Sequence, residues 1–149
     1  MGKRPNILVI DAQGGGVGRL LVSAIRQELP DVSLTAVGGN SAATAAMLKA
    51  GADQGATGEN AVEVACRRAD MIVGPIGIVI ADSMLGEITP KMAAAVARSG
   101  AKRILIPFDH CDNIVVGVRD AGMKALVQEA VSVLAEAVKA GDGKCPDPS

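Results

Sequence analysis

The chain has 149 residues, which fits a single domain of the usual size of about 100–200 residues. Its 15 Lys and Arg residues are balanced by 16 Asp and Glu residues, so the basic surface that nucleic-acid-binding proteins use is not expected. Hydrophobic residues make up 49% of the chain, yet aromatic residues make up 1%, a single Phe with no Tyr or Trp. Aromatic stacking on bases is therefore excluded, and no tyrosine is present to act as an acid or base.

Cysteine usage and hydropathy indicate where the protein resides. Cys66, Cys111 and Cys145 form an odd set without a C-x-x-C pair, which is typical of a reducing compartment and disfavours a disulfide framework or a structural zinc site. The first apolar stretch, Ile7–Ile10, is too short for a secretory leader. The longest apolar run, Met71–Ala81, falls well short of the roughly 20 residues that cross a membrane. We predict a cytoplasmic protein with no membrane partner.

Short apolar runs alternate with helical spacing along the chain. In chain order the pattern predicts a strand over 6–10, a helix that ends before Pro30, a strand over 33–37, a helix over 42–50, a strand over 54–57, a helix over 59–68, a strand over 70–74, a helix that begins at Thr89-Pro90 and ends at Ser99-Gly100, a strand over 102–107, a strand over 114–118 and a helix over 123–138. Residues 76–81 fit either an extension of the preceding strand or the start of a helix.

This alternation predicts a three-layer α/β fold, Rossmann-like, with a parallel sheet between two layers of helices and the first strand at its centre. We expect one domain over 1–149, with its core at 6–140 and a loose polar tail at 141–149. The last helix carries Val131 and Val133 outside its main apolar stripe. This wide apolar face favours a homo-oligomer; a helix buried within its own chain is the alternative.

A glycine-rich loop, Asp11-Ala12-Gln13-Gly14-Gly15-Gly16-Val17-Gly18, joins the first strand to the first helix. Backbone N–H groups and a helix N-terminus meet at such a junction and favour an anion, typically a phosphate. Glycines let the ligand approach without a Cβ in the way. The candidate ligand-binding residues are therefore Asp11, Gln13, Gly14, Gly15, Gly16, Val17 and Gly18. The alternative is a tight turn in which Gly18 packs the helix against the sheet.

Two common phosphate loops do not match this segment. The Walker A pattern fails because Gln13 holds the first glycine position, Arg19 replaces Lys and Leu20 replaces Ser or Thr. A nucleoside triphosphatase is therefore not expected. The dinucleotide fingerprint G-x-G-x-x-G fails because its last glycine would stand at position 19, not 18.

The loop spacing resembles the G-x-x-x-G-x-G loop of short-chain dehydrogenases. Gly16 and Gly18 match two of its glycines, and Ala12 stands at the first. The resemblance implies NADP or NAD as cofactor. It does not extend to the chemistry, because those enzymes use a Tyr-x-x-x-Lys pair and this chain has no Tyr.

Further ligand contacts are expected where the neighbouring strands end. A NAD site places an acid after the second strand to hold the ribose, whereas Asn40 and Ser41 stand there in this chain. That difference favours NADP, with a plain helix cap as the alternative. Gly74, Pro75 and Ile76 are expected to form the opposite wall of the same crevice or, alternatively, a sharp turn.

Few side chains in the sequence offer reaction chemistry. Asp11 is expected to orient a ligand, to bind a cation or to accept hydrogen bonds from the loop amides. Glu87, beside a glycine and near a helix start, is the second candidate acid. Cys111 beside His110 suggests a nucleophile and base, but adjacent side chains rarely point at one another. We assign no catalytic residue and expect no metal site, since the loop over 109–112 supplies too few spaced ligands.

Five segments taken together, DAQGGGVG, MLKAGADQGATGENAV, ADMIVGPIGI, SMLGEITPKM and ILIP, resemble an uncharacterised bacterial family, the domain of unknown function 3842. The resemblance spans Asn6 to Val118 and implies a small stand-alone Rossmann-like protein without an assigned activity. The sequence thus predicts a protein that binds a nucleotide or dinucleotide at the glycine loop. The alternative is a non-enzymatic sensor or assembly subunit for a small phosphorylated or carboxylated metabolite.

Overall fold

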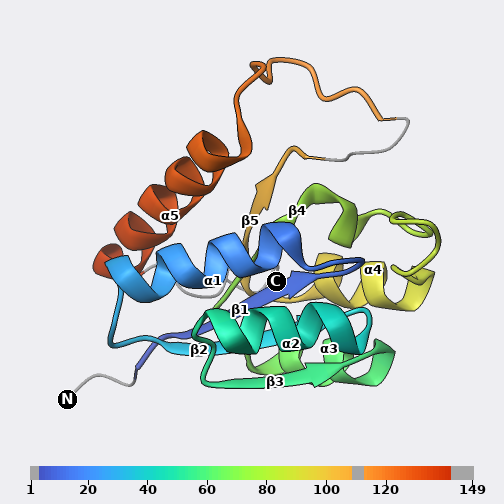
Figure 1. Cartoon of the computed structure of the whole chain (residues 1–149), viewed down its shortest axis with the longest axis horizontal. Coiled ribbons are helices and arrows are strands. Elements are labelled where there is room, and N and C mark those ends of the chain that lie inside the picture. The colour runs from blue at the N-terminus through green and yellow to red at the C-terminus, as the bar shows by residue number, and fades with distance from the viewer. Residues whose placement is uncertain (1–3, 109–112, 142–149) are drawn as a thin grey trace, which may run out of the picture.

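The structure, a computed structural model, describes residues 4–108 and 113–141 of the chain (Figure 1). Its elements in chain order are β1 (Asn6–Asp11), α1 (Gly16–Glu28), β2 (Ser33–Gly38), α2 (Ser41–Ala50), β3 (Gln54–Thr57), α3 (Glu59–Arg68), β4 (Met71–Pro75), the short 3-10 helix η1 (Ile76–Val79), α4 (Pro90–Arg98), β5 (Lys102–Ile106) and α5 (Met123–Ala140). The predicted alternation of strands and helices is confirmed for these elements.

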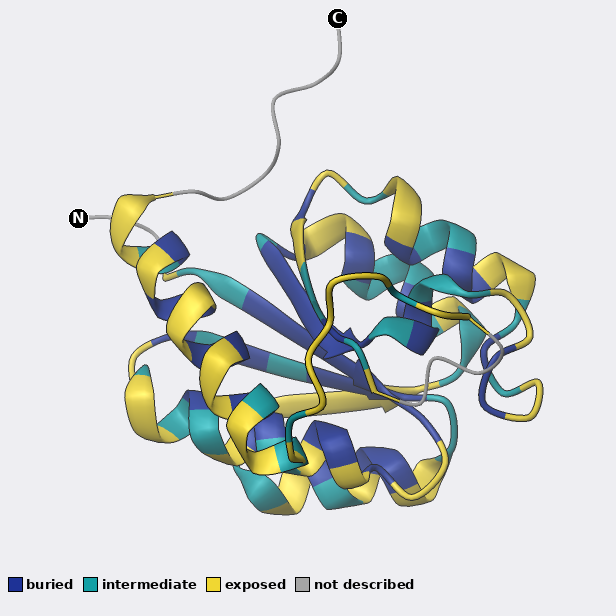
Figure 2. Ribbon diagram, turned by 90° about the horizontal axis from the view of Figure 1, so that it is seen from above, coloured by how far each residue is buried: buried dark blue, intermediate teal, exposed yellow. Residues whose placement is uncertain are grey.

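The described strands form one parallel sheet in the order β3-β2-β1-β4-β5, with β1 at the centre. Helices cover both faces of it, and Figure 2 shows the buried strands between two layers of helices. On one face α1, α2 and α5 pack on residues such as Ile7 and Val9, and on the other α3 and α4 pack on Leu8 and Ile10. Strands with both faces buried explain why β1 is a continuous apolar run. The predicted three-layer α/β fold is confirmed.

Two predicted segments differ in type from the structure, and several strands and helices begin or end one or two residues from the predicted bounds. The apolar residues over 114–118 form no strand. Ile114 and Val116 are exposed in the connection between β5 and α5. An apolar pattern alone does not make a strand when no neighbouring strand is there to pair with it. Residues 76–79 form a 3-10 turn, which was neither of the two expectations. Strand β1 continues one residue further than predicted and includes Asp11, whose side chain is held in the buried loop.

Helix α5 packs on α1 and β5, and its apolar residues divide between two sides. Val131 is 4% exposed and belongs to the core, whereas Val133 is 50% exposed. Only Val133 therefore remains for an outward apolar face. None of the helices in the described part of the chain is long and apolar enough to span a membrane.

This difference gives a matched test of the packing of α5. We expect Val131→Ala to lower the free energy of unfolding by about 2 kcal/mol, since buried methyl groups and their contacts are lost. The same change at Val133 should stay within about 0.5 kcal/mol. Urea unfolding of the two variants and the wild type measures both values, and equal losses would show that α5 does not pack as described.

Candidate functional site

The glycine loop lies at the carboxyl ends of the strands, between β1 and α1. The strand order reverses direction between β1 and β4, and ligands of open α/β sheets bind at such a switch point. A hollow of about 110 Å³ opens there. Its lining is the predicted loop together with three apolar residues from other elements: Asp11, Ala12, Gln13, Gly14, Gly15, Gly16, Val17, Pro75, Met84 and Phe108.

Asp11 holds the loop from beneath. Its side chain is buried, Oδ2 accepts a hydrogen bond of 2.6 Å from the Gly18 amide, and Oδ1 accepts one of 2.8 Å from the Ala12 amide. Of the three expected roles for Asp11, this one, acceptance of loop amides, is confirmed. The carboxylate thereby caps the first turn of α1, the place where a phosphate would otherwise bind.

Burial sets the protonation of Asp11. Loss of solvation raises the pKa of this carboxyl, and the backbone amides of Gly18, Ala12 and Val17 lower it; the nearby charge of Glu87 raises it again. The net pKa lies above the ordinary value of 3.8. The folded protein therefore holds a proton on Asp11 more readily than the unfolded chain does.

The loop glycines serve two different purposes. A Cβ on Gly18 would lie 2.6 Å from Met47 Sδ and 2.8 Å from Asp11 Cβ, and one on Gly15, whose φ is +72°, would lie 2.9 Å from Ala43 Cα. The fold therefore requires both glycines. For Gly18 this agrees with the alternative expectation, a tight turn in which Gly18 packs the helix against the sheet. A Cβ on Gly14 or Gly16 would meet no atom within 4 Å, so packing within the chain does not explain those two.

The amides of Gly14 and Gly16 are also uncommitted. Gly15 N–H donates to Ala12 O, Arg19 N–H to Gly15 O, and Gln13 N–H to the Glu87 carboxylate. No acceptor for the Gly14 or Gly16 amide lies within the described residues. Both residues are exposed, so the hollow presents two free N–H donors beside an open space.

Glu87 fastens the loop from a distant part of the chain. Its carboxylate accepts from Gln13 N–H, and its two oxygens lie 3.0 and 3.2 Å from Asn40 Nδ2. Asn40 Nδ2 also donates to Gln13 O at 2.8 Å, and Asn40 Oδ1 caps α2 by accepting from Ala43 N–H at 2.9 Å. The Asn40 side chain is therefore occupied in joining the loop to α2, and the Glu87 carboxylate holds both Asn40 and the start of the loop.

The segment that delivers Glu87 has an unusual backbone. Asp82, Met84 and Leu85 all have left-handed φ values, 64°, 55° and 56°, which side chains other than Gly seldom adopt. Met84 is buried and lines the hollow, whereas Leu85 is 97% exposed. Such clusters of strained residues gather at ligand sites.

Of the remaining predicted residues, some line this hollow and others do not. Pro75 lines it, but a Cβ on Gly74 would lie 2.5 Å from Ile10 O, so the sheet itself requires that glycine. Ile76 begins η1 and Ser41 is exposed at the start of α2; neither is among the lining residues. The loop over Asp109 to Asp112, with His110 and Cys111, lies outside the described residues.

Reaction chemistry is sparse at the hollow. Asp11 and Glu87 are its only nearby carboxyl groups in the part of the chain described, and both are engaged with amides. Cys66 lies buried between α3 and α4, and burial raises its pKa to about 11. Among the described residues, no group of three His, Cys, Asp or Glu is placed to hold a metal.

The buried Asp11 carboxyl predicts a pH dependence that Asp11→Asn removes. Between 3.8 and its raised pKa, the folded state binds more protons than the unfolded state, so this group's contribution to stability falls as the pH rises and then levels off. The unfolding free energy of the wild type minus that of the variant should therefore decline as the pH rises from below 3.8 through the raised pKa. A difference that rises with pH would contradict this assignment. Urea unfolding of both proteins at a series of pH values measures this difference.

Comparison with known proteins assigns the chain to a family without supplying an activity. No curated protein matches it. It is similar to a solved structure, the dodecameric FMN-dependent Ubix-like decarboxylase from Escherichia coli O157:H7, with 14% identity, a TM-score of 0.42 and coverage of 96% of this chain and 97% of that one. The family model described as Domain of unknown function (DUF3842) matches residues 6–139, and the chain belongs to this family.

Proposed function

We propose that the protein binds a small phosphorylated ligand, a mononucleotide or a phosphorylated metabolite, with the phosphate seated at Gly14 and Gly16. The observation that carries this proposal is the pair of uncommitted amides beside open space at the start of α1. Backbone N–H groups at a helix start are the donors that phosphates use most readily in α/β folds. Pro75, Met84 and Phe108 supply an apolar wall for the rest of the ligand.

The donors that remain open in the loop favour one phosphate group over two. The Val17 and Gly18 amides, which would extend the site along the first turn of α1, are taken by Asp11. A ligand held by a single phosphate therefore fits the loop better than a diphosphate does.

The second candidate is NADP or NAD, as the loop spacing predicts. The place of the hollow at the β1–β4 switch point supports a dinucleotide. Against it, the Asn40 amide is committed to Gln13, Glu87 and Ala43 and is not available to a ribose or a 2′-phosphate. Binding of the mononucleotide and of the dinucleotide therefore has to be compared directly.

Several large apolar side chains are exposed on the surface. Phe108, Ile114, Val116, Val118 and Val133 are large apolar residues with substantial exposure, and a homo-oligomer would cover them. We propose that the protein is a cytoplasmic homo-oligomer, in keeping with its cysteine usage.

Substitution of Gly16 tests the phosphate site. A Cβ there meets no atom within 4 Å and Gly16 has no left-handed φ, so the variant should fold while the Val methyl groups extend into the phosphate position. A ligand at a hundredfold excess over its dissociation constant stabilises the wild type by about 2.7 kcal/mol, a rise of about 5–10 °C in Tm. Differential scanning fluorimetry with adenosine 5′-monophosphate, inorganic phosphate, NADP and NAD should show this rise in the wild type and lose it in Gly16→Val.

Gly122→Val is the matched control. Gly122 also precedes a helix, α5, and a Cβ there also meets no atom within 4 Å, but it lies far along the chain from the loop. This variant should keep the full ligand-induced rise in Tm. If no phosphorylated probe stabilises the wild type, the glycine loop is only a turn and the proposed function is wrong.

Light scattering after size-exclusion chromatography tests the assembly. The exposed apolar residues predict a dimer or tetramer, that is, a mass of at least twice 15.0 kDa. A particle of 15.0 kDa at the highest concentration that the protein tolerates would contradict the proposed homo-oligomer.

A further inference from the structure

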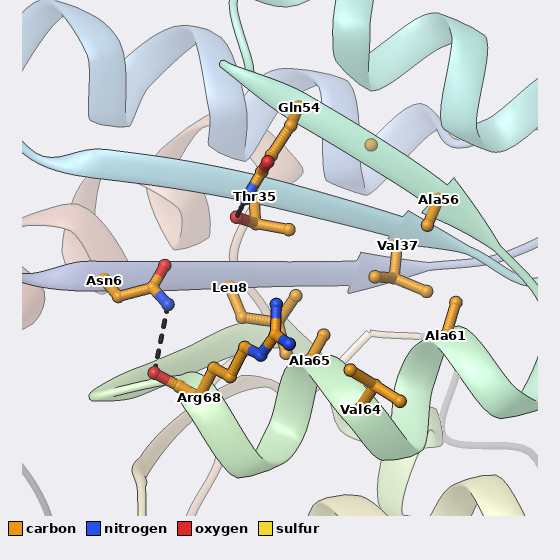
Figure 3. A pocket seen from close by; sticks show the side chains of 11 residues that line it. Asn6, Leu8, Thr35, Val37, Gln54, Ala56, Ala61, Val64, Ala65 and Arg68 are labelled. Atoms are coloured by element: carbon orange, nitrogen blue, oxygen red, sulfur yellow. Dashed lines mark hydrogen bonds between the residues drawn. The ribbon is translucent and has the colours of Figure 1, made fainter.

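A second hollow lies between helix α3 and strands β1, β2 and β3, on the sheet face opposite α1 and α2 (Figure 3). Its volume is about 220 Å³, and it shares no lining residue with the glycine-loop hollow. Leu8 and Val37 form part of its floor, and Ala61 and Ala65 part of its helical wall. It is a separate place on the molecule.

Small side chains create this hollow. The buried residues of α3 are Val62 and Cys66, which pack with the core beneath α4. Toward β2 and β3 the helix presents the short side chains of Ala61 and Ala65, which pack on the core at Leu8 and Val37. The four residues of β3 are all exposed. Short side chains on this side of α3 thus leave a hollow between the helix and the outer part of this sheet face.

The open part of the sheet carries polar groups in register. Leu8, Thr35 and Gln54 pair side by side across β1, β2 and β3. Gln54 Nε2 donates to Thr35 Oγ1 at 3.0 Å, which fixes both side chains within the hollow. The Thr35 hydroxyl proton and the Gln54 carbonyl oxygen remain available to a bound molecule.

Asn6 marks the end of the hollow near the last turn of α3. Its Nδ2 donates to Arg68 O at 3.0 Å, and its backbone N–H donates to Asp70 Oδ2 at 2.8 Å. Its Oδ1 is buried, and no donor reaches that atom from the described residues. Buried acceptors are normally satisfied, so this amide oxygen is an exception among the polar atoms at the edge of the hollow.

Arg68 supplies a cation without a counter-charge. Figure 3 shows its guanidinium extended over the floor beside Leu8 and Ala65. No carboxylate lies within ion-pair distance of Arg68 in the described part of the chain. A planar guanidinium beside apolar walls is well suited to a carboxylate, which it binds through two parallel hydrogen bonds.

We propose that this hollow binds a small monocarboxylate with an apolar body, its carboxylate on Arg68 and its body against Val37, Ala61 and Ala65. One cation neutralises a single negative charge, whereas a phosphate dianion would require donors that the alanine wall does not offer. The volume equals that of roughly seven water molecules in the liquid, so the ligand is of the size of benzoate. The inference is independent of the phosphate site.

A titration of the full chain with benzoate tests it by two-dimensional ¹H–¹⁵N NMR. Benzoate, up to about 10 mM to detect millimolar dissociation constants, should shift the amides of Thr35, Gln54 and Ala65 and leave those of Gly14 and Gly16 in place. Benzamide, which has the same shape without the charge, should bind at least about tenfold more weakly. Comparable binding of both probes would overturn the proposal, as would the absence of shifts with benzoate.

Three variants locate the contacts. Arg68→Gln should weaken benzoate binding about tenfold or more, which corresponds to the loss of one charged hydrogen-bonding partner. Arg67→Gln, a loss of the same charge from the neighbouring position outside the hollow, should leave binding within about twofold. Ala65→Leu should fill the hollow and abolish the shifts, while the spectrum reports that the fold is kept. Equal weakening by Arg67→Gln and Arg68→Gln would show only a general charge effect and would overturn the assignment.

Discussion

The buried carboxylate of Asp11 fixes the geometry on which the rest of the site depends. By accepting the Ala12 and Gly18 amides, it ties the end of the central strand β1 to the first turn of α1. It places its own negative charge where the positive end of the helix dipole would otherwise attract a ligand anion. Loss of solvation is the cost of this arrangement and raises the pKa of the group. The helix start is therefore occupied from within, and the outer part of the loop, at Gly14 and Gly16, stays open.

This division explains why four glycines in one loop do not behave alike. Gly15 and Gly18 lie so close to α2 and Asp11 that a side chain would collide with them, whereas Gly14 and Gly16 face open space with free amides. Glu87 and Asn40 hold the backbone of Gln13 at the start of the loop, and Asp11 holds the Gly18 amide at its end. A loop fastened at both ends and open in the middle is preorganised, so a ligand would bind it without the entropic cost of ordering it.

Much of the fold can be predicted from the sequence because strands and helices are marked by short, local patterns of apolar residues, glycine and proline. Apolar runs such as Ile7–Ile10 and Ile104–Ile106 predicted the central strands, since strands buried on both faces need no polar alternation. The run over 114–118 has the same composition but finds no neighbouring strand, and sequence alone does not reveal the absence of a partner. The glycine loop was found for the same local reason. The contact of Glu87 with Gln13, across 74 positions, arises from the tertiary fold, as does the hollow under α3, which depends on where short side chains face one another.

The central claim is that the ligand meets the Gly14 and Gly16 amides while Asp11 keeps the amides of the helix start. A ¹H–¹⁵N NMR titration with adenosine 5′-monophosphate measures this directly, because each amide reports its own hydrogen bond. The account predicts large downfield shifts of the Gly14 and Gly16 amide protons, with the Gly18 amide proton unchanged at its short bond to Asp11. If the Gly18 amide moves with the ligand and the Gly14 and Gly16 amides do not, the phosphate has displaced Asp11 and the account is wrong.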